Sequence, residues 1–202
     1  MEDAAKFVAG NLALDFHNTV SWKGDIPFED NILESYSDVL NWAVRAGILD
    51  TSSAQDMAEW ANAAPVAAAE GLSRIHGLRD VLHLVFDAAA RGEAPSTQTL
   101  SQLNDWISCL PLRLRATDHS FTWEWTVFRE DPSSVVWPVV WSAANLLRSD
   151  QLGRVGACEA TGCGWLFVDQ SRRHNRKWCE METCGNRAKA QRHYRRKQLG
   201  RP

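Results

Sequence analysis

Four of the five cysteines in this 202-residue chain lie close together near its C-terminal end, in two pairs. Four residues separate Cys158 from Cys163 and Cys179 from Cys184, and 15 residues separate the two pairs. Each pair can chelate a metal from a tight turn, and the chain between the pairs is long enough to go out and return. The spacing therefore predicts one structural zinc ion held by four thiolates.

The alternative is four unconnected buried cysteines, with the fifth, Cys109, free in either case.

The chain starts with an acidic segment rather than a basic one followed by an apolar stretch, and no apolar run reaches the ~18–20 residues of a membrane span. These features predict a cytoplasmic protein with no membrane partner. Clustered cysteines in a reducing compartment favour metal binding over disulfides.

The net charge of −3 is divided unevenly along the chain. Residues 1–153 contain 10 Lys and Arg against 21 Asp and Glu, a formal charge of −11, whereas residues 154–202 contain 12 against 4, a charge of +8. A basic cysteine-bearing tail on an acidic body predicts a separate module with an anionic partner, for which DNA is the first candidate.

The basic residues of the tail form two groups that could contact DNA phosphates. One group lies between the cysteine pairs, and the other follows Cys184 in a strong helical pattern. The alternative is that this helix docks on the acidic body or on another protein. For Arg187, we expect a structural role beside the last cysteine rather than a contact with a phosphate. The candidate DNA-binding residues are Arg172, Arg173, Arg176, Lys177, Arg187, Lys189, Arg192, Arg195, Arg196 and Lys197.

The apolar periodicity predicts the elements that position these groups. Helical patterns cover residues 35–49, 50–60, 65–92, 96–110 and 132–147, and alternation over 112–128 predicts a β-hairpin with one buried face. Residues 11–20 fit either a strand or a short buried helix, and 22–30 resemble a loop. In the tail, we expect a strand at 165–169, a polar turn at 170–176 and a return ending at Trp178.

These elements predict an α+β protein in two parts. Residues 1–150 form a mainly helical domain with an antiparallel hairpin, suited to sensing or dimerisation. Residues 154–202 form a small treble-clef-like zinc finger with a basic C-terminal helix, and Gly153 and Gly156 mark the hinge between the two.

Two sets of residues resemble a known family. The run Cys184-Gly185-Asn186-Arg187, preceded by Phe167, Asp169, Ser171, Arg176 and Trp178, resembles the CGNR zinc finger. Gly10-Asn11, Leu14-Asp15-Phe16 and Asn18-Thr19 are similar to the start of the ABATE domain, which precedes that finger in bacterial proteins. The resemblance implies a transcription regulator induced by stress, an activity that is itself inferred for the family.

Polar residues inside apolar patterns are the remaining candidates. Asp15, His17 and Asn18 interrupt the first apolar run, where they would act as caps or line a ligand pocket. His76, Asp80, His83 and Asp87 recur at helical spacing and could bind a metal, but a solvated polar face is the expected role. No nucleotide-binding glycine loop or nucleophile motif is present, so we predict no enzymatic activity.

The sequence thus predicts a zinc-finger DNA-binding protein, a transcription regulator whose body senses a signal or dimerises. The alternative is a ligand-binding or protein-interaction protein whose zinc module is only structural. A small-molecule effector and a homodimer are left open as further partners.

Overall fold

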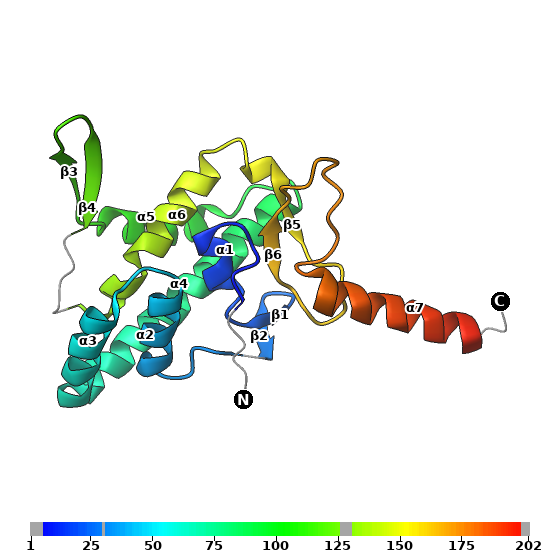
Figure 1. Cartoon of the computed structure of the whole chain (residues 1–202), viewed down its shortest axis with the longest axis horizontal. Helices are drawn as coiled ribbons and strands as arrows, with labels where there is room; N and C mark the ends of the chain where they lie inside the picture. Colours follow the sequence, from blue (N-terminus) through cyan, green and yellow to red (C-terminus); the bar gives the residue numbers. More distant parts are fainter. Residues whose placement is uncertain (1–5, 30, 126–130, 199–202) are drawn as a thin grey trace.

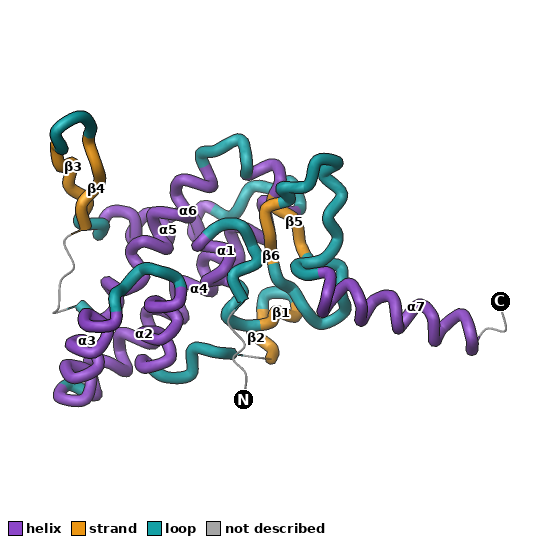
Figure 2. Tube along the Cα trace, in the orientation of Figure 1, coloured by secondary structure: helices purple, strands orange, loops and turns teal. Residues whose placement is uncertain are grey.

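The computed structural model describes the chain except for residues 1–5, 30, 126–130 and 199–202. Helices dominate the body, and the three sheets are antiparallel pairs of short strands (Figures 1 and 2). The helices are α1 (Leu12–His17), α2 (Tyr36–Arg45), α3 (Thr51–Ala63), α4 (Pro65–Ala90), α5 (Thr97–Ser108), η1 (Pro132–Val136), α6 (Trp137–Leu147), η2 (Leu152–Arg154), η3 (Met181–Gly185) and α7 (Asn186–Gln198). The strands are β1 (Ser21–Lys23), β2 (Ile26–Glu29), β3 (Leu112–Ala116), β4 (Phe121–Trp125), β5 (Val155–Ala157) and β6 (Leu166–Val168).

The long helix α4 is the centre of the body. It packs against α1, α2, α3, α5 and η1, and its buried side chains include Ile75, Leu82 and Phe86. The predicted helices of the body are confirmed. Side chains cap the first N–H groups of some of them: Asp50 accepts a hydrogen bond from the Ser53 N–H at the start of α3, and Ser96 from the Thr99 N–H at the start of α5.

Residues 11–20, which fitted either a strand or a helix, form the short helix α1. The side chain of Asn11 accepts a hydrogen bond from the Ala13 N–H at 2.9 Å and so caps the helix. Leu14 and Phe16 are fully buried, and α1 packs against α4 and α6. Both faces of this helix are covered, which explains why its sequence shows no helical stripe.

The hairpin predicted over residues 112–128 forms as β3 and β4, with residues 126–128 outside the described part of the chain, but the prediction of a buried face is wrong. Leu114 is 57% exposed, Phe121 70% and Trp123 49%. The hairpin projects from the body (Figure 1), where the ring of Trp123 contacts that of Trp141 with the centroids 5.6 Å apart. Alternation identifies a strand pair, but it does not reveal whether another element covers it.

Residues 22–30, predicted as a loop, contain a second hairpin, β1–β2. Gly24 forms its turn with a φ of 59°, and Trp22 pairs with Pro27. The prediction missed these strands because three or four residues with an irregular register are too few to show alternation. This hairpin contacts the finger, because the backbone N–H of Trp22 donates to the carbonyl of Cys163, 3.3 Å away.

The finger shares its first sheet with the body. Strand β6 pairs with β5, which precedes the first cysteine, and not with the later segment that we expected to return along it. Val155, Leu166 and Val168 belong to the core of the body, whereas Phe167 packs against the cysteine cluster. Because successive residues of a strand face opposite sides, β6 contributes to both cores.

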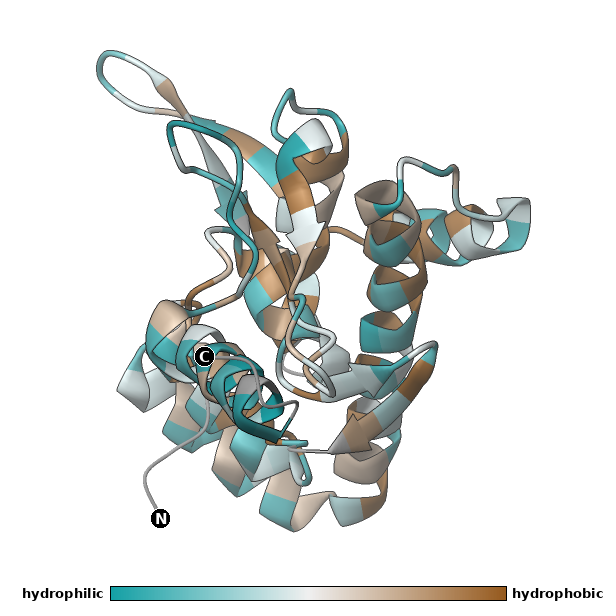
Figure 3. Ribbon diagram, turned by 90° about the vertical axis from the view of Figure 1, so that its right-hand side faces the viewer, coloured by the Kyte–Doolittle hydropathy of each residue, from teal (hydrophilic) through white to brown (hydrophobic). Residues whose placement is uncertain are grey.

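The C-terminal helix α7 leaves the finger and extends away from the body (Figure 1). Its residues are mostly hydrophilic (Figure 3). None of the helices described has an apolar stretch of the length needed to cross a membrane.

Candidate metal centre

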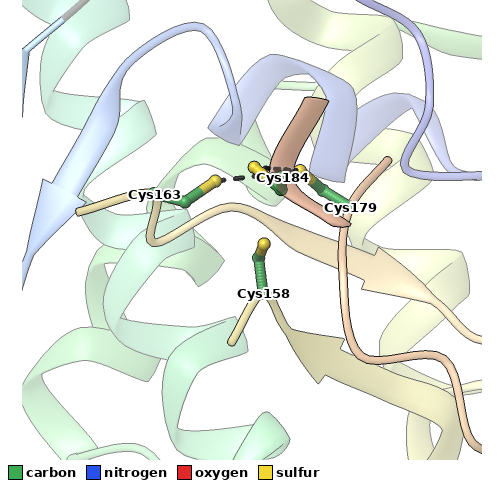
Figure 4. A group of neighbouring side chains, drawn as sticks. All are labelled: Cys158, Cys163, Cys179 and Cys184. Atoms are coloured by element: carbon green, nitrogen blue, oxygen red, sulfur yellow. Dashed lines mark hydrogen bonds between the residues drawn. The ribbon is translucent and has the colours of Figure 1, made fainter. Parts of the chain in front are cut away.

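The four predicted ligand cysteines meet at one point, as Figure 4 shows. The Sγ atoms of Cys163 and Cys179 are 3.7 Å apart, and those of Cys179 and Cys184 are 3.6 Å apart. Four thiolates about 2.3 Å from a tetrahedral zinc ion have their sulfur atoms about 3.8 Å apart. The cluster therefore fits one zinc ion, and the buried sulfurs are free thiols rather than disulfides.

The close approach of the sulfur atoms separates the pKa values of the thiols. Hydrogen bonding with Cys163 and Cys179 lowers the pKa of Cys158, whereas hydrogen bonding with Cys158 raises the pKa values of Cys163 and Cys179. Zinc binds thiolates, so zinc binding releases protons and weakens at low pH.

A compact turn places the first pair of ligands. The Cys158 N–H donates to the carbonyl of Trp165 at 2.8 Å, and the Cys163 N–H donates to that of Ala160 at 3.1 Å. Gly164 follows with a φ of 66°, and a Cβ atom there would lie 2.6 Å from the carbonyl oxygen of Trp22. Only glycine allows strand β1 to approach the turn so closely.

The last ligand lies where η3 passes into α7. Cys184 is buried, and Nη2 of Arg187 donates to its Sγ at 3.5 Å. Four thiolates and one Zn²⁺ carry a formal charge of −2, which this guanidinium partly offsets. The structure thus places Arg187 beside the metal ligand.

Arg176 is half-buried, and its guanidinium group contacts the finger and the N-terminal segment. Its guanidinium donates to the carbonyls of Val8 at 2.9 Å, Trp178 at 3.0 Å and Cys179, and it stacks over the ring of Phe167 with 4.3 Å to the centroid. A guanidinium whose donors are used in this way holds the second ligand pair against the N-terminal segment. We therefore do not assign it to DNA.

The other basic residues lie on the outer surface. Arg172 and Arg173 are exposed on the turn after β6, and Lys189, Arg192, Arg195 and Lys197 are exposed on α7. The side chain of Arg196 lies outside the described part of the chain. Lys177 forms an ion pair with Glu159 at 3.1 Å, and together with Arg192 and Arg195 it lines a groove of about 260 Å³. The structure thus brings Lys177 of the first basic group beside the basic side chains of α7, whereas Arg172 and Arg173 do not line this groove.

The three residues proposed for a ligand pocket are buried and hold the body together. Asp15 accepts a hydrogen bond from the Ala9 N–H at 2.9 Å, and His17 lies 2.9 Å from both the Asn18 side chain and His83. Asn18 in turn binds the backbone of Leu166. These contacts between distant segments carry no sequence signal beyond the presence of polar residues in an apolar run.

The fold and the cysteine centre define a zinc-finger protein with a helical body joined to the finger. Comparison with known families agrees: residues 154–197 match the CGNR zinc finger, and residues 10–150 match ABATE, described as "Putative stress-induced transcription regulator". The chain belongs to the ABATE family and carries a CGNR zinc finger with one structural zinc ion. A comparison with curated proteins gave no match.

Proposed function

We propose that this protein is a cytoplasmic transcription regulator that binds DNA through the outer surface of its zinc finger. The observation that carries the proposal is the groove between the first cysteine turn and α7, where Lys177, Arg192 and Arg195 lie together. Basic side chains that converge from two segments of a rigid scaffold can contact neighbouring phosphates of a duplex.

The composition and position of α7 support this proposal. Six of the eleven residues from 187 to 197 are basic and none is acidic. The helix extends away from the acidic body (Figure 1), and its described basic side chains are exposed. A helix free on its outer side is available for the major groove of DNA, whereas one docked on the body would have its charges paired there.

A salt titration of binding to mixed-sequence duplex DNA tests the proposal. Each phosphate neutralised contributes about 0.9 to the slope of log affinity against log salt. Replacing Arg192 and Arg195 with Ala should therefore flatten that slope by roughly 2 and weaken binding at low salt.

The matched control replaces Arg113 and Arg115, two exposed arginines of the body, with Ala. This change removes the same charge and should leave the slope unaltered. Zinc content should stay at one per chain in all variants. A wild-type protein that binds no duplex at low salt would contradict the proposal and favour a ligand-binding or protein-interaction role with a structural zinc module.

A homodimer and a small-molecule effector stay predictions. Light scattering across a range of protein concentrations measures the first, and a thermal-shift screen of small molecules measures the second.

A further inference from the structure

A second group of metal-binding side chains lies in the body, outside the cysteine cluster. His83 on α4 is buried, with 3% of its surface exposed, and faces Asp25 in the β1–β2 turn and Asp87 one turn further along α4. Nε2 of His83 lies 3.6 Å from Oδ1 of Asp25, and one ligand atom from each of the three residues lies within 4.8 Å of the others.

Hydrogen bonds from the finger determine which nitrogen of His83 carries the proton. The backbone of Leu166 fixes the orientation of the Asn18 amide, because the Asn18 Nδ2 donates to its carbonyl and the Oδ1 accepts from its N–H. The same Oδ1 lies 2.9 Å from Nδ1 of His17. Because an amide oxygen can only accept, Nδ1 of His17 carries the proton and donates this hydrogen bond.

The proton pattern continues from His17 to His83. His17 is fully buried between the Asn18 amide and the His83 ring, an environment that favours a neutral ring. A neutral His17 protonated at Nδ1 has its lone pair at Nε2. Its Nε2 lies 2.9 Å from Nδ1 of His83, which donates this hydrogen bond. The lone pair of His83 is consequently at Nε2, the atom that faces the carboxylates.

Nothing in the described part of the chain donates a hydrogen bond to that Nε2 atom. A buried acceptor without a partner is destabilising, so this lone pair points to a ligand. The ring is also held in place: Trp22 stacks on it with 3.8 Å between the centroids and 4° between the planes. A histidine whose other nitrogen is hydrogen-bonded and whose ring is fixed is typical of metal sites.

A simple ion pair explains these observations less well. The distance of 3.6 Å between His83 and Asp25 is too long for a hydrogen bond. Arg91 contacts one oxygen of Asp87, which leaves the other oxygen for an ion. Asp25 is exposed and can rotate to shorten the remaining distances.

We propose that Asp25, His83 and Asp87 form a second metal site, which binds a divalent first-row transition ion. One imidazole nitrogen and two carboxylate oxygens suit Mn²⁺, Fe²⁺ or Zn²⁺, whereas the four thiolates of the finger select zinc. The site is joined to the finger by Trp22. The indole ring of Trp22 stacks on the His83 ring, and its backbone N–H donates to the carbonyl of Cys163. The proposal does not depend on DNA binding.

Manganese is the probe that separates the two sites. Full-length protein carrying one zinc ion is titrated with Mn²⁺, and free Mn²⁺ is measured by electron paramagnetic resonance. We expect one Mn²⁺ per chain, with at least tenfold weaker binding in Asp25→Asn and in Asp87→Asn. Asp25 is exposed, so its substitution should leave folding intact even where a His83 variant fails to fold.

Asp118→Asn, an exposed substitution in the β3–β4 turn with the same loss of charge, should bind as the wild type does. Elemental analysis should also detect a second zinc ion when zinc alone is supplied in excess, and this ion should be absent from Asp25→Asn. No uptake of Mn²⁺ or of a second zinc ion by the wild type, or unchanged binding in both Asp variants, would overturn the proposal.

Discussion

The side chain of Asn18 forms two hydrogen bonds with the backbone of Leu166. Its Nδ2 donates to the Leu166 carbonyl at 2.8 Å, and its Oδ1 accepts from the Leu166 N–H at 2.9 Å. Asn18 follows the first helix of the body, and Leu166 lies in the strand that begins after the first cysteine pair. Both residues are buried, so their hydrogen bonds join the region that matches ABATE to the region that matches the zinc finger in the interior of the protein.

Replacing Asn18 with Ala should destabilise both parts of the protein. The change leaves a buried N–H and a buried carbonyl of Leu166 without their partner, at a cost of about 1–3 kcal/mol for each group. Urea unfolding should report this loss, and zinc should exchange faster with a chelator. Asn62→Ala, an exposed change within α3, is the control. If zinc exchanged as slowly in Asn18→Ala as in the wild type, the hydrogen bonds between Asn18 and Leu166 would not stabilise the finger.

Removing zinc should weaken the whole chain. Ser in place of Cys158, Cys163, Cys179 or Cys184 should lower the zinc content below one per chain, whereas Cys109→Ser should not, since Cys109 is exposed and is not part of the cluster. Because Val155, Leu166 and Val168 are part of the core of the body, we expect one cooperative thermal transition that moves to lower temperature with a chelator. A body transition that does not move would show that the two parts unfold separately.

Two glycines beside Cys163 allow a matched test of the contact with β1. Gly162 and Gly164 both have positive φ, of 74° and 66°, but a Cβ at Gly162 would meet nothing within 4 Å. Gly162→Ala should therefore cost only the backbone strain of about 1–2 kcal/mol. Gly164→Ala should cost clearly more, because its Cβ would lie 2.6 Å from the carbonyl oxygen of Trp22. Equal losses in urea unfolding would contradict the close approach of β1.

Local chemistry made much of this protein predictable from its sequence. The cysteine spacing predicted the zinc cluster, and apolar periodicity predicted the helices of the body. The role of Arg176 could not be predicted, because its partners are carbonyls brought together by folding. His83 shows the same limit: helical spacing grouped it with His76, but His76 binds the Leu33 carbonyl, while His83 is enclosed by the β1–β2 hairpin that the sequence did not reveal.

The carboxyl group of Asp15 should make stability depend on pH. Burial raises its pKa from 3.8 to about 6, against the opposing effect of N–H groups from Ala9 and Val8 and of Arg176. Between those two pH values the folded state holds a proton that the unfolded state has released. The stability that Asp15 contributes is thus complete below about pH 4 and is lost as the pH rises through 6.

Asp15→Asn keeps an acceptor for the Ala9 N–H but does not titrate, so it isolates this effect. From pH 5 to pH 7 the free energy of unfolding of the wild type should fall by about 1.4 kcal/mol relative to that of the variant, the value of one pKa unit. Urea unfolding of both proteins at each pH measures the difference between their free energies of unfolding. The effects of other titrating groups and of zinc release are the same in both proteins and cancel in this difference. A constant difference across this range would mean that Asp15 is ionised in the folded protein already at pH 5.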